Sequence, residues 1–109
     1  MNLLTKQEEL YLLTIHRLGE PAYLVNIRGH LLEHTGKDWA FGSLYITLTK
    51  LLKKGLLETY TGEPSANRGG KAIKYYRLTE EGMFALTEAK KLQDVMWSGF
   101  SPSLAEKKI

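Results

Sequence analysis

The sequence contains no cysteine, which excludes disulfides and thiolate metal sites. It also has no run of about 18 apolar residues, so it predicts no transmembrane helix. The first residues place acidic side chains ahead of an apolar run, and they lack the basic start and small-residue cleavage site of a signal peptide. The sequence therefore favours a cytoplasmic protein, and its 109 residues are enough for one domain.

Residue patterns for catalysis are also missing. No arrangement of Ser, His and Asp and no pair of carboxylates is persuasive, and Gly69-Gly70-Lys71 lacks the strand-to-helix context of a phosphate-binding loop. Residues 30–34 do match H-x-x-E-H, a zinc-peptidase pattern that would place His30 and His34 on one helix face. Such peptidases need a further acidic ligand and a large cleft, and a chain of this size offers neither. We therefore expect no enzyme activity, no cofactor and no metal ion.

The net charge is only +3, but its distribution along the chain is uneven. Residues 41–78 hold seven basic and two acidic side chains, a net charge of +5, so the rest of the chain carries −2. A basic middle between mildly acidic ends is the pattern expected of a protein that binds a phosphate backbone. The alternative is a basic face that only contacts water.

Three helices are predicted before residue 56. They are expected to begin after Thr5, at about Tyr23 and at about Ser43, and to end before Gly19, Gly36 and Gly55. Thr5 and Glu8 form a T-x-x-E capping box, and a glycine after a helix often takes the left-handed conformation that ends it. In the third helix, apolar residues recur at i, i+4, i+7 and i+8, so the buried side should hold Leu44, Leu48, Leu51 and Leu52. Trp39 and Phe41 are expected to be packing anchors in the short connection over residues 36–42.

Two strands and a last helix follow. Residues 56–62 and 73–79 are rich in β-branched and aromatic residues, and the glycine-rich stretch between them is typical of a long basic loop. Thr79 is placed to cap a helix that continues to about Trp97. Three helices followed by a hairpin predict a winged helix-turn-helix, a mostly helical α+β fold in which the third helix enters the major groove. The expected divisions are a DNA-binding domain over residues 1–79, a dimerisation helix over 80–100 and a flexible tail over 101–109.

Specific residues on these elements resemble the PadR-like family of transcriptional regulators. The segment Gly42-Ser43-Leu44-Tyr45 resembles the start of the family's recognition helix, and residues 74–82, KYYRLTEEG, resemble its second wing strand running into the last helix. The Glu-Leu-Tyr-Leu-Leu run of the first helix is also similar. The resemblance covers roughly residues 5–90 and implies a homodimeric DNA-binding regulator, commonly a repressor, in a short form without a separate C-terminal domain.

The exposed side of the third helix and the wing supply the candidate DNA-binding residues. On the helix, Ser43, Ile46, Thr47 and Lys50 could reach base edges. Tyr45 could contact a phosphate through its hydroxyl or remain a tyrosine at the edge of the core. The remaining candidates, which would contact phosphates and fix the register, are Lys53, Lys54, Asn67, Arg68, Lys71 and Lys74.

The last helix supplies the candidate dimer interface. Its apolar residues follow the 4-3-4 spacing of a helix pair, and the first helix has a second apolar side. The expected interface residues are Leu10, Leu13, Ala85, Ala89, Leu92, Met96 and, if the helix persists, Phe100. Trp39, Trp97 and Phe100 could line a pocket for an aromatic small-molecule effector at the dimer centre. Alternatively, they only pack within the protein. The alternative to DNA binding is a winged-helix module that binds protein through these apolar faces.

Overall fold

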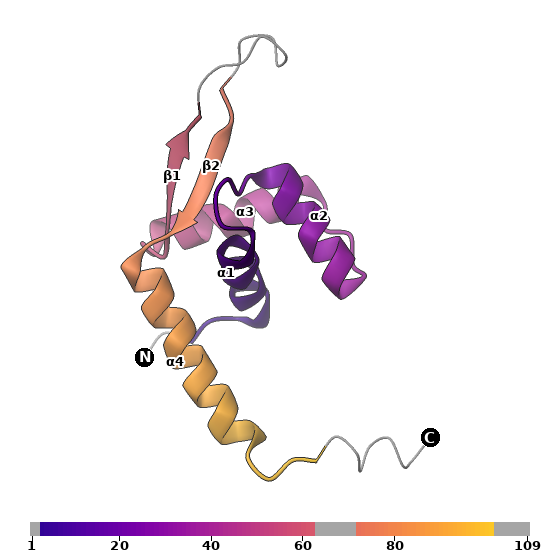
Figure 1. Cartoon of the computed structure of the whole chain (residues 1–109), viewed down its shortest axis with the longest axis vertical. Coiled ribbons are helices and arrows are strands. Elements are labelled where there is room, and N and C mark those ends of the chain that lie inside the picture. Colours follow the sequence, from indigo (N-terminus) through magenta and orange to yellow (C-terminus); the bar gives the residue numbers. More distant parts are fainter. Residues whose placement is uncertain (1–2, 63–71, 102–109) are drawn as a thin grey trace.

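The computed structural model describes residues 3–62 and 72–101, and it confirms the winged helix-turn-helix. Figure 1 shows three helices, an antiparallel hairpin and a fourth helix in chain order. The elements are α1 (Lys6–Leu18), α2 (Leu24–Thr35), α3 (Phe41–Lys53), β1 (Leu57–Thr61), β2 (Lys74–Leu78) and α4 (Glu80–Trp97). Helix α3 begins two residues earlier than expected, at Phe41 instead of Ser43. The wing loop over residues 63–71 and the tail from residue 102 lie outside the described residues.

Local sequence signals account for the helix ends. At the start of α1, Thr5 Oγ1 accepts a hydrogen bond from the Glu8 amide at 3.0 Å, and Glu8 Oε1 accepts one from the Thr5 amide at 2.9 Å. This is the predicted capping box, which satisfies two amides that the helix itself leaves free. Gly36 and Gly55 follow α2 and α3 with φ angles of 75° and 77°, in the left-handed region that side chains disfavour.

The core lies where α1, α2 and α3 meet beneath the hairpin. Its fully buried side chains come from all three helices: Tyr11, Leu12, Ile15, Ile27, Leu31, Leu44, Leu48 and Leu51. Trp39 packs against this cluster with its ring edge-on to Tyr11, at 6.0 Å between centroids, as expected of an anchor. Phe41, expected to be a second anchor, is instead exposed: it is the first residue of α3, and its ring lies at the surface against the Arg28 guanidinium.

The hairpin is tied to the helices through β2. Strands β1 and β2 pair with Leu57 opposite Leu78 and Tyr60 opposite Tyr75. The Tyr76 amide also donates a hydrogen bond of 2.8 Å to the carbonyl of Ala22, just before α2. This bond and the burial of Tyr76 fix the base of the wing beside the start of α2.

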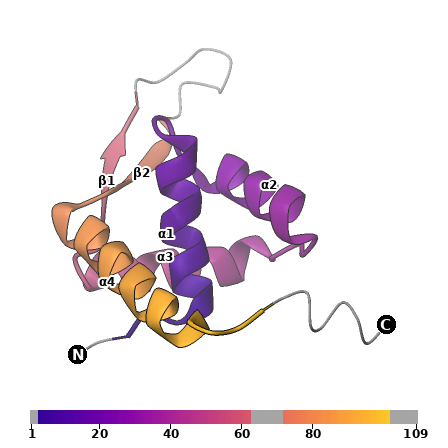
Figure 2. The same cartoon turned by 60° about the horizontal axis from the view of Figure 1, so that its bottom comes forward.

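Helix α4 packs on the body only along part of its length. It contacts β2 and α1, with Leu86 against the core, and Gln93 donates a hydrogen bond to the Glu9 carboxylate on α1. Figure 1 shows its C-terminal end extending below the three-helix body, and in Figure 2 the same end crosses in front of α1. The helix ends at Trp97, so Phe100 does not continue the row of apolar residues at 4-3-4 spacing that ends at Met96. The Phe100 ring instead lies edge-on to Trp97, with 5.1 Å between centroids. Among the described residues, no helix is long and apolar enough to cross a membrane.

Candidate nucleic-acid interface

The outer face of α3 carries most of the helix residues that the sequence nominated. Because Leu44, Leu48 and Leu51 are buried, the opposite side of the helix faces outward. Ile46 is 58% exposed on that side, although an isoleucine would normally be buried. The other nominated helix residues are Ser43, Tyr45, Lys50 and Lys53, which are exposed, and Thr47, which is half-buried.

Lys54 departs from this group because its ammonium is paired with a carboxylate of the same chain. Its Nζ lies 2.6 Å from Oε2 of Glu8, a buried carboxylate at the start of α1. Burial alone would raise the pKa of Glu8, but the hydrogen bonds from Lys54 and Thr5, together with the Lys54 charge, hold that pKa below its usual value. Lys54 therefore joins the end of α3 to the start of α1, and sequence reasoning missed its partner.

The wing contributes Lys74 to the same surface as α3. Lys74 Nζ lies 5.4 Å from the ring centroid of Tyr45 and 5.6 Å from that of Tyr76. Cations are attracted to aromatic faces at such distances. Strand β2 thus places a positive charge beside the recognition helix. Between Lys74 and the start of α2 lies a shallow, mostly apolar groove lined by Tyr23, Leu24, Val25, Tyr45, Ile73 and Tyr76.

Val25 is a residue of this surface that sequence reasoning did not single out. It lies in the first turn of α2 and is 61% exposed. Its neighbour Leu24 packs against the core instead. From the sequence both are simply apolar, and nothing there indicates which of the two is exposed. The position of Val25 beside Tyr45 is a product of how α2 meets α3 and β2.

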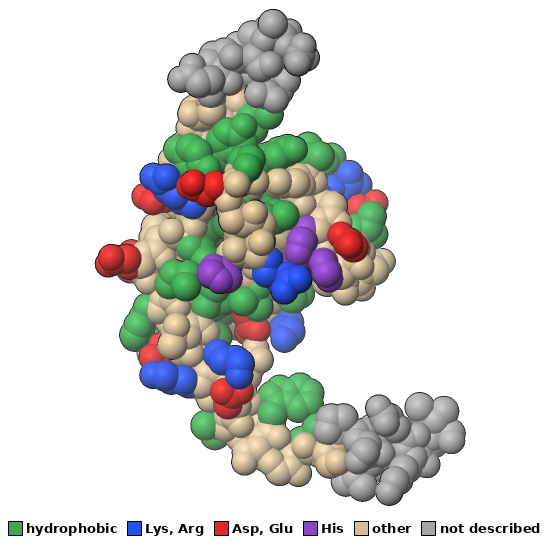
Figure 3. All heavy atoms as spheres, in the orientation of Figure 1, with side chains coloured by type: hydrophobic (Ala, Val, Ile, Leu, Met, Phe, Trp, Pro, Cys, Tyr) green, Lys and Arg blue, Asp and Glu red, His purple; other side chains and the backbone are tan. Residues whose placement is uncertain are grey.

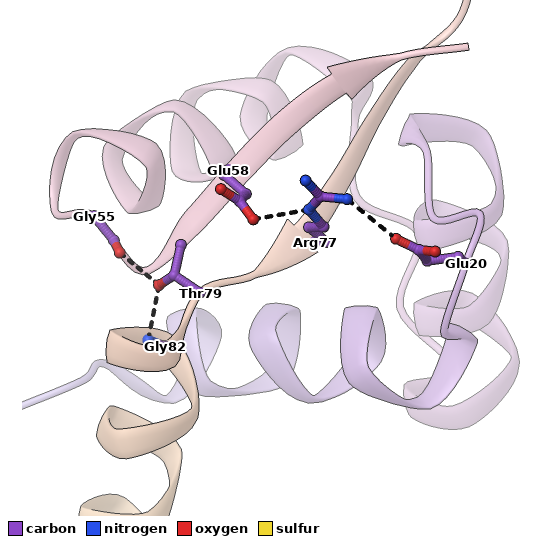
Figure 4. A network of polar contacts seen from close by, with 6 residues as sticks. All are labelled: Glu20, Gly55, Glu58, Arg77, Thr79 and Gly82. Atoms are coloured by element: carbon purple, nitrogen blue, oxygen red, sulfur yellow. Dashed lines mark hydrogen bonds and ion pairs between the residues drawn. The ribbon is translucent and has the colours of Figure 1, made fainter.

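The basic cluster of residues 41–78 is divided by the fold. Arg77 forms ion pairs with Glu58 at 2.8 Å and Glu20 at 3.6 Å, as Figure 4 shows. With Lys54 paired to Glu8, two of the seven basic side chains are neutralised within the chain. Within residues 3–62 and 72–101, the basic side chains of this cluster without a carboxylate partner are Lys50, Lys53 and Lys74. On the face seen in Figure 3, charges of both signs are interspersed. The candidates Asn67, Arg68 and Lys71 lie outside the described residues.

His30 and His34 lie on one face of α2, as the H-x-x-E-H spacing predicts, with ring centroids 4.2 Å apart. However, Arg17 Nε donates a hydrogen bond of 3.4 Å to His30 Nε2, a nitrogen that a metal would use. Burial and the nearby charges of His34 and Arg17 lower the pKa of His30. Within the described part of the chain, no group of three or more histidine or carboxylate side chains is placed to hold a metal ion.

The candidate dimer residues differ in how exposed they are in the single chain. Met96 is 73% exposed, and Leu92 and Leu13 are also exposed, whereas Ala85 and Ala89 are half-buried. Leu10 packs against the chain's own core. Sequence reasoning missed Phe84 and Val95, which are exposed on α4 beside this seam. Of the aromatic effector candidates, Trp39 packs on Tyr11, while Trp97 and Phe100 contact each other in the open.

Comparison with known proteins identifies the family. A family model for the PadR-like transcriptional regulators matches residues 10–88. A PadR-like transcription factor from Bacteroides fragilis is 31% identical over 83% of this chain and 82% of that chain, with a TM-score of 0.71. A PadR family regulator from Eggerthella lenta is 30% identical over 85% of this chain and 79% of that chain, with a TM-score of 0.67. One from Clostridium difficile is 26% identical over 82% of this chain and 86% of that chain, also with a TM-score of 0.67. No curated protein matches significantly.

The sequence match and the fold agree with each other. The matched residues run from the second turn of α1 into α4 and so include α2, α3 and both strands of the wing. The family consists of DNA-binding transcription factors and not of enzymes, in keeping with the outward-facing recognition helix described above. The chain therefore belongs to the PadR-like family of transcriptional regulators.

Proposed function

We propose that this regulator represses transcription as a homodimer that binds a pseudo-palindromic operator. The observation that carries the proposal is the meeting of the wing and α3, where Lys74 Nζ lies 5.4 Å from the Tyr45 ring. One surface therefore offers a helix that fits the major groove and a cation from the wing. In winged-helix proteins, these two elements contact a groove and the adjacent backbone.

The proposed contacts follow from which side chains are free. Ser43, Ile46 and Lys50 are exposed on α3 and would read base edges, with Ile46 against a thymine methyl group. Lys53, Lys74 and, from the wing loop, Arg68 would contact phosphates. We do not include Lys54, because leaving the buried Glu8 carboxylate without its cation would be costly.

The homodimer is supported by the apolar surface that α4 leaves uncovered. Leu92, Val95 and Met96 are all exposed near its C-terminal end, and monomers rarely expose contiguous apolar patches of this kind. A two-fold partner would cover both copies at once. It would also set two recognition helices about one turn of DNA apart, ~34 Å, which matches two halves of a palindrome.

DNA binding can be tested with a duplex that the wild-type protein selects from a random pool. Lys50→Ala is expected to weaken binding and to change the base preference. Arg68→Ala should weaken binding to all sequences and reduce the slope of log K against log salt by ~1. Lys90→Ala, on the exposed side of α4, removes the same charge and serves as the control. If Lys50→Ala and Arg68→Ala together left the affinity and its salt dependence unchanged, the DNA face would be misplaced.

The dimer can be tested by light scattering. Replacing Leu92 and Met96 with Glu is expected to give a folded monomer with much weaker operator binding, because buried carboxylates would face each other across the two-fold axis. Thr87→Glu places a single carboxylate at an exposed position of α4 away from Leu92 and Met96, and it should leave the dimer intact. A wild-type protein that is monomeric at micromolar concentration and still binds its operator tightly would contradict the proposal.

We also propose that a flat aromatic molecule releases the repressor by contacting Trp97 and Phe100. Both rings are exposed and lie at the end of the helix that would form the dimer. In a Trp39→Phe variant, Trp97 is the only tryptophan, so its fluorescence reports such binding directly. If planar aromatic compounds neither quench that fluorescence nor weaken operator binding, the effector is excluded from this site.

A further inference from the structure

Arg28 contacts three residues of the turn that leads into the recognition helix. From the middle of α2, its Nε donates a hydrogen bond of 2.9 Å to the carbonyl of Trp39. Its Nη2 lies 2.9 Å and 3.0 Å from the two carboxylate oxygens of Asp38. Its guanidinium carbon lies 4.4 Å from the ring centroid of Phe41, the first residue of α3. The Arg28 side chain thus contacts a backbone carbonyl, a carboxylate and an aromatic ring of the same turn.

Helix α3 has no cap of its own at this end. The N-cap residue is Ala40, whose side chain has no acceptor for the free amides of the first turn, and that turn contains no acidic residue. An alanine at this position typically costs ~1 kcal/mol relative to Ser, Asp or Asn. The turn is fixed instead from two sides, by the Trp39 ring packed on Tyr11 and by Arg28.

The direction of this first turn decides where the DNA-facing residues lie. Gly42 and Ser43 are exposed in it, and Ile46 follows one turn later on the same helix. A base contact is lost if its side chain moves by about an ångström, because hydrogen bonds and methyl contacts are short-ranged. A phosphate contact by a long lysine side chain tolerates such a shift. Loosening the turn should therefore reduce sequence discrimination more than overall affinity for DNA.

Arg28 is not itself arranged as a DNA contact. Its side chain is only 33% exposed, and its charge is already met by Asp38. Lysine could not replace it, because a single ammonium cannot stack flat on Phe41 while donating to both a carbonyl and a carboxylate. We propose that Arg28 is a positioning residue, which orients the first turn of α3 and thereby sets sequence discrimination without contacting DNA. This inference rests on the proposed operator binding.

The first test compares wild type with Arg28→Lys on two duplexes, the one selected by wild type and a scrambled version of it. Arg28→Lys is expected to lower the affinity for the selected duplex about tenfold, the effect of roughly one lost base contact. Affinity for the scrambled duplex should stay within about twofold. Because lysine keeps the positive charge, the salt slope is measured in a second variant, Arg28→Gln, and it should not change. Arg17→Lys, an exposed arginine on α1, is the matched control and should change none of these.

Three outcomes of this test would overturn the inference. In Arg28→Gln, which removes the charge, a salt slope reduced by ~0.9 would show that Arg28 neutralises a phosphate. An equal loss of affinity on both duplexes would show that it contributes to binding as a whole. A lower melting temperature with unchanged affinities for both duplexes would show a role in stability alone.

The second test needs no DNA. The Leu44 amide, which donates a hydrogen bond of 3.1 Å to the carbonyl of Ala40, should exchange its hydrogen faster in Arg28→Lys, while exchange in the buried part of α3 around Leu48 stays as in wild type. Unchanged exchange of the Leu44 amide would overturn the inference even if DNA affinity fell. If wild type selects no duplex, the operator proposal fails, and this measurement still decides whether Arg28 holds the turn.

Discussion

Replacing Gly82 with alanine is expected to destabilise the protein, although alanine is normally the better helix residue. Gly82 lies in the first turn of α4, buried against the segment between α3 and β1. A Cβ atom there would lie 2.2 Å from the carbonyl oxygen of Leu56 and 3.0 Å from Leu78 Cδ2. Because the first of these is a backbone atom, it cannot move aside as the end of a flexible side chain would.

The cost can be worked out from what must move. Overpacking of this kind typically costs ~1–3 kcal/mol. A shift of α4 away from Leu56 would also break the 3.2 Å hydrogen bond from the Thr79 amide to the Leu56 carbonyl and the 2.6 Å bond from Thr79 Oγ1 to the Gly55 carbonyl. Each is worth ~1 kcal/mol, and the helix propensity of alanine returns at most ~1 kcal/mol. The net loss in free energy of unfolding is about 2–4 kcal/mol, or a melting temperature lower by about 10–20 °C.

The assay is urea unfolding followed by far-ultraviolet circular dichroism, at one protomer concentration because a dimer's stability depends on it. Gly29→Ala is the matched control, since Gly29 lies in the interior of α2 and the Cβ atom of an alanine there would meet nothing within 4 Å. It should stabilise the protein by ~0.5–1 kcal/mol. A Gly82→Ala protein as stable as wild type, beside a Gly29→Ala protein that behaves as expected, would refute the steric reasoning.

Three further predictions concern polar contacts. Thr79→Val should lower the free energy of unfolding by about 1–2 kcal/mol, because Thr79 Oγ1 caps Gly82 (Figure 4), and Thr79→Ser should restore most of it in the same urea assay. The lowered pKa of Glu8 means that its ionisation stabilises the fold above the unfolded pKa of 4.5, and that this contribution fades as the pH falls through the folded pKa. Glu8→Gln should therefore be less stable than wild type at pH 7 and approach it in acid, whereas Glu58→Gln, at an exposed pair, should differ little at either pH. Lys54→Met should lower the free energy of unfolding without changing the salt slope of DNA binding. A slope reduced by ~1 would show that Lys54 contacts a phosphate after all.

Much of the fold could be predicted from local sequence. The capping box at Thr5, the glycines at 36 and 55, and the spacing of the leucines in α3 each act within a few residues of themselves. Because such signals depend only on nearby residues, they predict the order of the elements and the winged helix-turn-helix without knowledge of tertiary contacts. The outward face of α3 also follows, because burying Leu44, Leu48 and Leu51 leaves only one side of the helix free.

The partners of the charged residues could not be predicted in this way. Lys54 lies 46 residues from Glu8 in the chain, and only the crossing of α1 and α3 brings them within 2.6 Å. Arg28 likewise looks like any helix-surface arginine until the turn after α2 brings Asp38, Trp39 and Phe41 against it. Sequence periodicity assigns a residue to a face, but it does not say which other element that face meets.

Gly82 illustrates the difference between what local sequence explains and what only tertiary structure explains. The sequence contains it as part of the wing-to-helix segment KYYRLTEEG, where a glycine in the first turn of a helix has no local purpose. Its reason is the Leu56 carbonyl, which approaches so closely that no side chain fits between α4 and the segment before β1. Local sequence determined the helices, the strands and their order, because those depend on near neighbours. Tertiary structure alone decided where α4 presses on the body and which cations remain free for DNA, because both depend on residues far apart in the chain.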